Sequence, residues 1–471
     1  MPINSFLYPA PSTPTFPYQV ANSLRFDDDS SHSLTRTFGS GNQKTWTWSA
    51  WVKKTANLTT LGNFDFVLFN GYQDNNNRLS IFYSQTSADS SVDDCLKIFG
   101  TASGSTSVNA STSAVYRDNS AWYHVVCAFD TTQATGSDRI KIYVNGVQQT
   151  LTFDTTPAQN SNQSINFNQN HTIGNYNTNT TSTEFDGYMA EVVFIDGTAL
   201  DPTSFGEFDS DSPTIWKPID VSGLTFGTNG FYLDFEDSSA LGNDVSGNNN
   251  DFTVNNLTSV DQSTDTCTNN FATLNPLFAT QDSGTITEGN TIYTASANAW
   301  GGSGSTIGLT QGKWYFEIQI NNNAGGHFFG VIDDSANVND NPHQRTGSTF
   351  YYSGGQMYKD GSGSGSYSTF GASDIGGVYL NLDDNQISIY KNGSAIVTDF
   401  ALSTTKNTLF VWVMGYNSGS DQLKVNFGGT PPFTISSGNA DANGYGNFEY
   451  SPTLSGVNYY SINTKNLAEF G

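Results

Sequence analysis

The chain has 471 residues, enough for two or three domains that each bury a core of their own. Aromatic residues make up 14% of it, which argues against a disordered chain, and the formal net charge of −25 disfavours partners such as nucleic acid or anionic lipid. The three cysteines, Cys95, Cys127 and Cys267, lie far apart, which argues against a disulfide framework or a zinc site.

Residues 1–20 carry five prolines and several aromatic side chains, a composition typical of an extended arm. The arm is open to two interpretations, a loose leader or a docking peptide. It lacks the basic and apolar regions of a signal peptide, and no run of about 18 apolar residues predicts a membrane span. We therefore expect no signal peptide and no membrane insertion.

Residues 21–215 read as a series of short strands, because apolar residues recur at every second position. WTWSAWV (46–52) places Trp46, Trp48, Ala50 and Val52 on one face. In the stretch RIKIYVNG, Asn145-Gly146 supplies the two residues that tolerate positive φ in a type I′ hairpin turn.

Residues 216–275 are rich in Asp, Asn and Gly and are interpreted as a bridge between two domains. Strand-like pieces such as FYLDF could add to a neighbouring sheet, and the segment could also be the remnant of a third module. Aspartates suit hard cations such as Ca²⁺. Of the acidic clusters at Asp27–Asp29, at Asp333/Asp334 and in the bridge, the last is the favoured calcium site, with the ligands Asp234, Asp237, Asp244 and Asp251.

A second series of strands covers residues 276–430, and it contains QISIYKNG, a second copy of the pattern Ile-x-Ile-Tyr-x-Asn-Gly. The flanks of the two copies differ, so the pattern predicts two similar hairpins in unrelated domains rather than a duplication. The tail 431–471 holds many aromatic residues, and we expect it to pack back on the second domain.

The first region resembles the laminin G-like, concanavalin A-like jelly-roll family in RTFGSGNQKTWTWSAWVKK, in AWYHVVCAFDTT with IKIYVNGVQQ, and in FDGYMAEVVFIDGTALDP. The second region resembles the SPRY family in GKWYFEIQI, FFGVIDD, GGVYLNLDDNQISIYKNG and LFVWVMGY. The order of these modules, with NFEYSPTLSGVNYYSINTKNLAEFG after them, resembles virion fibre-like proteins of marine bacteriophages.

These resemblances imply an all-β chain of two concanavalin A-like antiparallel β-sandwiches, a laminin G-like jelly roll and a SPRY domain, joined by the bridge. They imply a non-enzymatic virion protein, a tail fibre or appendage, that binds a host surface glycan or protein through sandwich loops. Its partners would be other virion proteins, contacted through the arm, and further copies of itself in a homo-oligomer, with a trimer favoured. The alternative is a structural virion component, such as a head fibre or capsid decoration, that contacts mainly other virion proteins.

Loops that combine aromatic rings with Asn, Asp and Gly suit carbohydrate binding, because rings stack on a pyranose and amides supply directed hydrogen bonds. Three stretches have this mixture: NGYQDNNN, GNYNTNTTSTEFD and NDNPHQRTGSTFYY. The predicted ligand-binding residues in them are Tyr72, Tyr176, His343, Arg345, Tyr351 and Tyr352.

A second alternative is a polysaccharide-degrading enzyme, which would need two carboxylates about 5–5.5 Å apart if it retained configuration. Glu184 and Asp186 come nearest to this pattern. The next acid, Glu191, is expected on the opposite strand face, because it lies five residues after Asp186. No nucleophile elbow and no paired histidines occur, so we expect neither catalysis nor a cofactor, apart from the calcium ion considered above.

Overall fold

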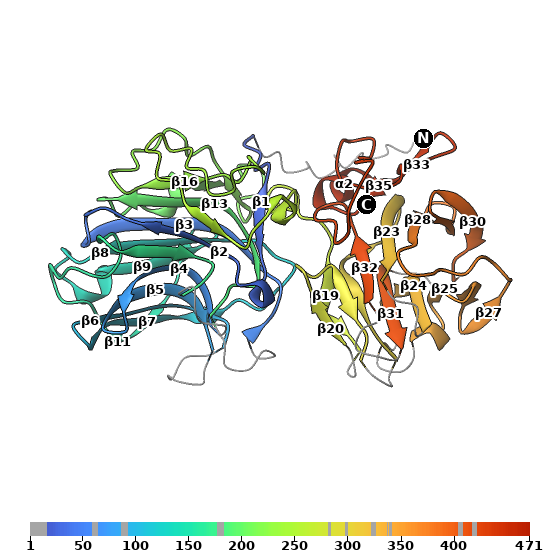
Figure 1. Ribbon diagram of the computed structural model, residues 1–471, viewed down its shortest axis with the longest axis horizontal. Helices are drawn as coiled ribbons and strands as arrows, with labels where there is room; N and C mark the ends of the chain where they lie inside the picture. The colour runs from blue at the N-terminus through green and yellow to red at the C-terminus, as the bar shows by residue number, and fades with distance from the viewer. Residues whose placement is uncertain are drawn as a thin grey trace, which may run out of the picture.

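The computed structural model describes residues 17–58, 65–85, 93–176, 183–280, 284–296, 300–321, 326–336, 338, 342–403, 408–416 and 422–471. Figure 1 shows two β-rich bodies side by side, with the blue-to-green part of the chain in one and the yellow-to-red part in the other. Each body has two packed sheets of mainly antiparallel strands, which confirms the prediction of two β-sandwiches. No helix of the described residues is long and apolar enough to cross a membrane.

The first sheet of the first sandwich centres on β3, Thr45–Lys54, which turns Trp46, Trp48, Ala50 and Val52 into the core as the alternation predicts. Its strands are, in spatial order, β10 Val147–Gln148, β9 Ile140–Val144, β8 Tyr123–Asp130, β3, β13 Gly187–Asp196, β1 Ser23–Phe26 and β18 Gln262–Ser263.

The second sheet of the first sandwich closes the core from the other side. Its strands are, in spatial order, β11 Leu151–Thr155, β7 Ser105–Val115, β6 Cys95–Ala102, β5 Asn77–Ser84, β4 Phe66–Asp74, β12 Asn170–Ile173, β2 Ser33–Thr37 and β17 Thr253–Asn255. Shorter elements lie around the sandwich: η1 Asp28–Ser30, η2 Gly136–Asp138, η3 Pro202–Ser204, η4 Ser259–Asp261 and the hairpin of β14 Gly206–Phe208 with β15 Trp216–Pro218.

The segment 216–275 differs from the expected bridge, because most of it is built into the first sandwich. Within FYLDF, β16 (Phe231–Leu233) pairs with β13, and β17 pairs with β2 on the opposite sheet. Phe231, Leu233 and Phe252 bury their side chains in the first core. The expectation that FYLDF could add to a neighbouring sheet is therefore confirmed, whereas the turn-forming Asp, Asn and Gly around β17 hide its strand character in the sequence.

The second sandwich also has two sheets around its own core. One sheet contains, in spatial order, β19 Leu274–Ala279, β22 Trp300–Leu309, β31 Leu409–Tyr416, β24 Gly326–Asp333, β25 Ser348–Tyr352, β26 Gln356–Lys359 and β27 Ser362–Ser364. The other contains β20 Thr285–Thr287, β21 Ile292–Thr294, β32 Gln422–Asn426, β23 Lys313–Ile320, β28 Ile375–Asn381, β29 Gln386–Lys391 and β30 Ser394–Ala401.

The C-terminal tail packs on this second sheet. Its strand β35, Tyr460–Ser461, pairs in parallel with β23. The rings of Phe448 and Tyr459 meet the outward rings of Tyr315 and Tyr379 edge to face. The buried carboxylate of Glu317 accepts hydrogen bonds from the backbone N–H groups of residues 449 and 450. The hairpin of β33 (Thr453–Leu454) with β34 (Val457–Asn458) and the helix α2 (Thr464–Phe470) complete the tail.

Buried polar contacts join the two sandwiches. The Tyr188 hydroxyl donates to the carbonyl of Gly289, and the Asn290 amide donates to the carbonyl of Thr55, each at a donor–acceptor distance of 2.8 Å. The guanidinium of Arg25 forms ion pairs with Asp261 at 2.8 Å and with Glu288 of the second sandwich at 2.6 Å.

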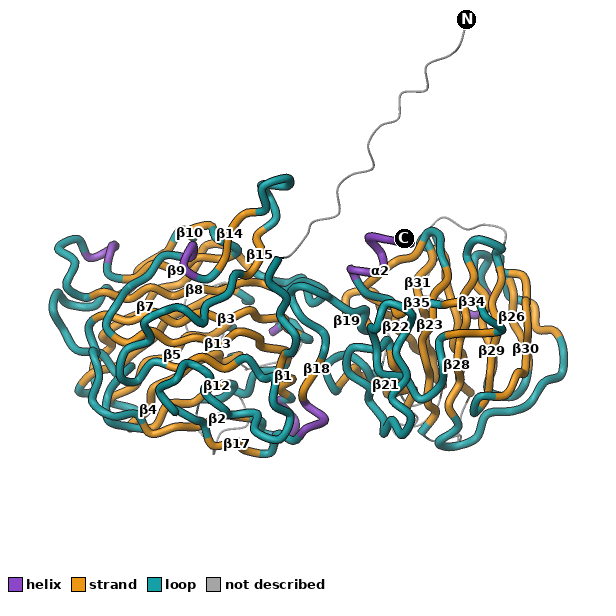
Figure 2. The backbone as a smooth tube through the Cα atoms, turned by 90° about the horizontal axis from the view of Figure 1, so that it is seen from above, coloured by secondary structure: helices purple, strands orange, loops and turns teal. Residues whose placement is uncertain are grey.

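Buried polar contacts also hold the connecting chain against the first sandwich. Lys53 of β3 is fully buried, and its Nζ lies 2.8 Å from both Asp265 Oδ2 and Asn270 Oδ1. Figure 2 shows the connection between β18 and β19 running directly from one body to the other. The two sandwiches therefore form one unit with a fixed mutual orientation.

Candidate functional site

Aromatic rings cover the outer face of the second-sandwich sheet that contains β24, β25 and β31. Strand alternation turns Phe329, Val331 and Val413 into the core and leaves Phe328, Met414 and their neighbours outside. We call this surface the aromatic face; its half-buried rings are Phe278, Trp300, Tyr352, Tyr358, Phe410 and Tyr416, and they lie over the buried rings of Phe328, His343 and Trp412.

Glycines in β22 allow these rings to lie against the sheet. A Cβ at Gly304 would come within 2.4 Å of the Phe278 ring and 3.0 Å of the Trp412 ring. The glycines of the sequence WGGSGS therefore leave room for aromatic side chains to lie against the sheet. Trp300, at the start of β22, was not among the predicted ligand-binding residues, although the glycines that follow it were a usable signal.

Two of the predicted ligand-binding residues converge on one ring of the aromatic face. The rings of His343, from η5 (Pro342–Gln344), and of Tyr352, from β25, stack on Phe328 with centroids 4.4 and 4.8 Å away. The indole of Trp300 lies 5.0 Å from the His343 ring. Burial lowers the pKa of His343, so this imidazole is uncharged at neutral pH.

Tyr351 does not share this position. It precedes Tyr352 on β25, so its side chain points to the opposite side of the sheet, where it is fully buried in the core. Its hydroxyl donates to the carbonyl of Ser368. The prediction of Tyr351 as a ligand contact overlooked that neighbouring strand residues face opposite ways. Arg345 is half-buried beside β25, and its carbonyl accepts a hydrogen bond from Ser348.

On the first sandwich the structure brings together the other two predicted tyrosines. The rings of Tyr72, from β4, and Tyr176, just after β12, meet edge to face with centroids 5.2 Å apart. The guanidinium of Arg78 lies 4.9 Å above the Tyr176 ring. These half-buried rings form a smaller aromatic cluster; residues 177–182 of the predicted loop lie outside the described residues.

The four aspartates expected to bind calcium instead hold turns of the chain. The carboxylate of Asp244 accepts hydrogen bonds from the backbone N–H groups of Tyr232, residue 246 and residue 250. Asp251 accepts one from the backbone of Asp244, and Asp234 and Asp237 each cap the residue two positions on. Their short side chains accept hydrogen bonds within local turns, and this role explains why the segment is rich in Asp, Asn and Gly.

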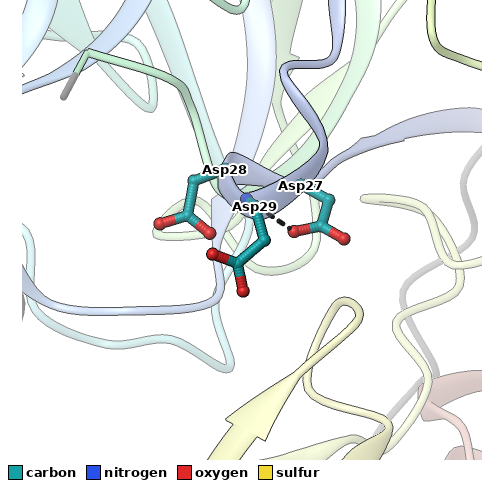
Figure 3. A group of neighbouring side chains, drawn as sticks. All are labelled: Asp27, Asp28 and Asp29. Carbon is teal, nitrogen blue, oxygen red and sulfur yellow. Dashed lines mark hydrogen bonds between the residues drawn. The ribbon is translucent and has the colours of Figure 1, made fainter. Parts of the chain in front are cut away.

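Asp27, Asp28 and Asp29 form the acidic group whose geometry could hold a cation. One carboxylate oxygen from each residue lies within 4.8 Å of the other two. Figure 3 shows the three side chains at one turn, where Asp27 also accepts a hydrogen bond from the backbone N–H of Asp29. Burial and the neighbouring charges of Asp29, Asp27 and Glu184 raise the pKa of Asp28 to about 6. Three hard oxygen ligands at one turn suit Ca²⁺ better than the dispersed bridge aspartates do.

Glu184 and Asp186, the carboxylates nearest to the pattern of a polysaccharide-degrading enzyme, lie near this acidic group. Desolvation and the charges of Asp28 and Asp27 raise the pKa of Asp186 well above its usual value. A bulge in β13 places Glu191 on the outer face, on the same side as Val193, so the parity expectation for Glu191 was wrong. At about 3.3 Å per residue, Glu191 lies at least about 13 Å along the strand from Asp186, beyond the spacing of a glycosidase pair.

Two family models match the chain. Residues 27–203 match the concanavalin A-like lectin/glucanases superfamily, and residues 313–430 match the SPRY domain. These matches confirm the predicted laminin G-like and SPRY modules, and lectin-like sandwiches with a SPRY domain indicate a binding function. Neither match reaches the residues 216–257 that complete the first sandwich.

Solved structures with similar folds include the SPRY domain of human HERC1, which is 24% identical, with 32% of this chain and 96% of that chain covered and a TM-score of 0.29. A heptameric SAP-like pentraxin from Limulus polyphemus is 16% identical, with 39% and 79% covered and a TM-score of 0.28. Stonustoxin is 19% identical, with 33% and 27% covered and a TM-score of 0.26. The search of curated proteins finds no match.

Proposed function

We propose that this chain is a non-enzymatic binding protein that recognises a host surface glycan or protein, as a tail fibre or other appendage of a bacteriophage particle. The aromatic face is the observation that carries the proposal. Half-buried rings offer flat apolar surfaces on which the C–H faces of a pyranose can stack. Such stacking binds a sugar without any covalent step.

The virion assignment is supported by the order of the modules and by the N-terminal arm. Residues 17–20 of the arm are anchored on the first sandwich. The Tyr18 hydroxyl bonds to Glu191 and Tyr232, and the Val20 N–H donates to Thr268. An arm fixed at this end would present residues 1–16 to other virion proteins, and the complete protein would act as a homo-oligomer, by preference a trimer.

A glycan array and a host-cell binding assay test the proposal on the full chain. We expect Trp300→Ala and Tyr352→Ala each to weaken binding about 5- to 30-fold, which corresponds to about 1–2 kcal/mol per lost ring contact. Tyr390→Ala is the matched control, because Tyr390 is half-buried on the other sheet of the same sandwich.

Three results would contradict the proposal. Binding to particles but to no glycan or cell surface would indicate the structural alternative. Release of reducing sugar that Glu184→Gln abolishes would indicate an enzyme. Equal effects of Tyr390→Ala and the two variants of the aromatic face would remove this surface as the site.

A further inference from the structure

A cleft of about 770 Å³ lies where the first sandwich, the connecting chain and the C-terminal helix meet. Its walls include Trp51 of β3, Trp122 just before β8 and Trp216 of β15. Tyr445 and Lys465 of the C-terminal tail also line it. A cavity of this size accommodates a ligand of several hundred daltons, and it is separate from the aromatic face.

Two of the tryptophan walls are held in place by their own hydrogen bonds. The indole N–H of Trp216 donates to His124 Nδ1 at a distance of 2.9 Å, and that of Trp122 donates to Asp265 Oδ1 at a distance of 3.1 Å. Because Nδ1 of His124 accepts, Nε2 carries the proton and faces Ser49 Oγ at 2.9 Å. This histidine therefore orients a wall and cannot act as a base toward the serine.

The indole groups of Trp122 and Trp216 expose ring surface rather than N–H donors to the cleft, because their N–H groups are already bonded. Trp51, Trp122 and Trp216 keep 4%, 8% and 7% of their surface exposed, so each contributes a strip of apolar wall. Asparagine and threonine side chains complete the lining, among them Asn145, Thr268 and Asn270. Apolar walls with a few polar groups between them suit a ligand that has both C–H faces and hydroxyls.

Lys465 gives the cleft a charge that is unusual on this protein. Its Nζ lies 5.3 Å from the centre of the Tyr445 ring, and no ion pair between described residues includes it. The chain as a whole carries a net charge of −25. A half-buried ammonium without a carboxylate partner, on such an acidic protein, favours an anionic group on the ligand.

We infer that this cleft between the sandwiches binds an anionic saccharide, a pyranose unit that bears a carboxylate or a sulfate. Lys465 pairs with the anion, and the indole walls contact the faces of the sugar. The inference rests on the proposed glycan recognition and adds to it a second site and a ligand class.

Calorimetric titration of the full chain tests the inference with a panel of uronate-, sialate- and sulfate-bearing oligosaccharides and their neutral counterparts. We expect anionic members to bind more tightly than their neutral counterparts. Lys465→Gln should weaken that binding at least tenfold. Ala468→Trp, which places a bulky ring on an exposed lining position of α2, should abolish it.

Lys424→Gln is the matched control, because it removes the same charge from a half-buried lysine of β32 that does not line the cleft. We expect it to leave affinity unchanged. Melting temperatures of all variants establish that the fold is retained, so that a loss of binding reports on the cleft itself.

The inference and the proposed function fail in different ways. Glycan binding that Trp300→Ala weakens, but that Lys465→Gln and Ala468→Trp leave intact, would support the aromatic face and overturn the cleft. Absence of binding to every anionic member would also overturn it. A synthetic peptide of residues 1–16 that binds the full chain, and no longer binds after Ala468→Trp, would show that the arm is the occupant instead.

Discussion

Glu191 is a buried acid on a strained backbone, and its environment makes stability depend on pH. It adopts a φ of 53° at the bulge of β13, it is 7% exposed, and the hydroxyls of Tyr18 and Tyr232 donate to it. Burial raises its pKa to about 7, an effect that the two hydroxyls oppose and the charges of Asp234 and Glu236 reinforce. Such a combination of strain and burial stores free energy at one residue.

Between pH 4.5 and pH 7 the folded state holds a proton on Glu191 that the unfolded state releases. The free energy of unfolding therefore falls as the pH rises through this range, by about 2–3 kcal/mol for a shift of this size. We expect Glu191→Gln to remove this loss, so that the variant gains stability relative to the natural chain as the pH rises. Urea unfolding at pH 4.5, 6 and 8 measures the effect.

The exposed Glu469→Gln serves as the control and should leave the slope with pH unchanged. An identical pH slope for Glu191→Gln and the natural chain would show that folding does not raise the pKa of Glu191.

At the scale of elements, the two hairpins with the pattern Ile-x-Ile-Tyr-x-Asn-Gly have the same turn and different neighbours. The pairs Asn145-Gly146 and Asn392-Gly393 have φ values of 48° and 77°, and of 48° and 76°. A Cβ at Gly146 would lie 2.4 Å from the Trp216 ring, whereas one at Gly393 would lie 3.0 Å from the Tyr450 ring. The turn at Asn145-Gly146 therefore packs closely against Trp216, which is a wall of the cleft.

Alanine at each glycine separates backbone strain from packing. We expect Gly393→Ala to lower the free energy of unfolding by about 1–2 kcal/mol, mainly through the left-handed backbone. Gly146→Ala should cost about 2–4 kcal/mol, because the new methyl group also displaces the Trp216 ring. Denaturant unfolding measures both, and equal losses would contradict the packing role of Gly146.

Strand alternation was enough to predict the sandwiches, since each strand carries its own pattern, as WTWSAWV does for β3. The sequence indicated that FYLDF could add to a neighbouring sheet, but it did not predict that Phe231 and Phe252 complete the first core, because their partners lie far away in the chain. The candidate binding sites could also be predicted only in part. Tyr72, Tyr176, His343 and Tyr352 were predicted from loop composition as ligand contacts, and in the structure each lies against another ring. The cleft could not be predicted, because its lining residues Trp122 and Lys465 are far apart in the sequence.

For the whole molecule, the ion pairs of Arg25 determine whether the sandwiches unfold together. The Arg25 side chain is 7% exposed and Asp261 is 3% exposed, so loss of the cation leaves a buried carboxylate without its partner. We expect Arg25→Met to cost about 3–5 kcal/mol and to split one calorimetric transition into two. The matched control is Arg117→Met, whose 46%-exposed side chain pairs with Asp94.

A single transition for Arg25→Met with the full melting temperature would show that the remaining contacts suffice to couple the sandwiches. These include the hydrogen bonds of Tyr188 to Gly289, of Asn290 to Thr55 and of Ser263 to Gly429, together with the buried Lys53.

The fixed orientation of the two sandwiches has a consequence for polymeric ligands. Surfaces on a rigid body have a set separation, so a repeating polysaccharide can engage two of them at once only where its repeat matches that separation. For a matching repeat the second contact becomes intramolecular, and avidity can exceed single-site affinity by about 10²–10⁴. A mismatched repeat gains nothing, so under the proposed glycan recognition the fixed separation of the two surfaces would select polysaccharides by the length of their repeat.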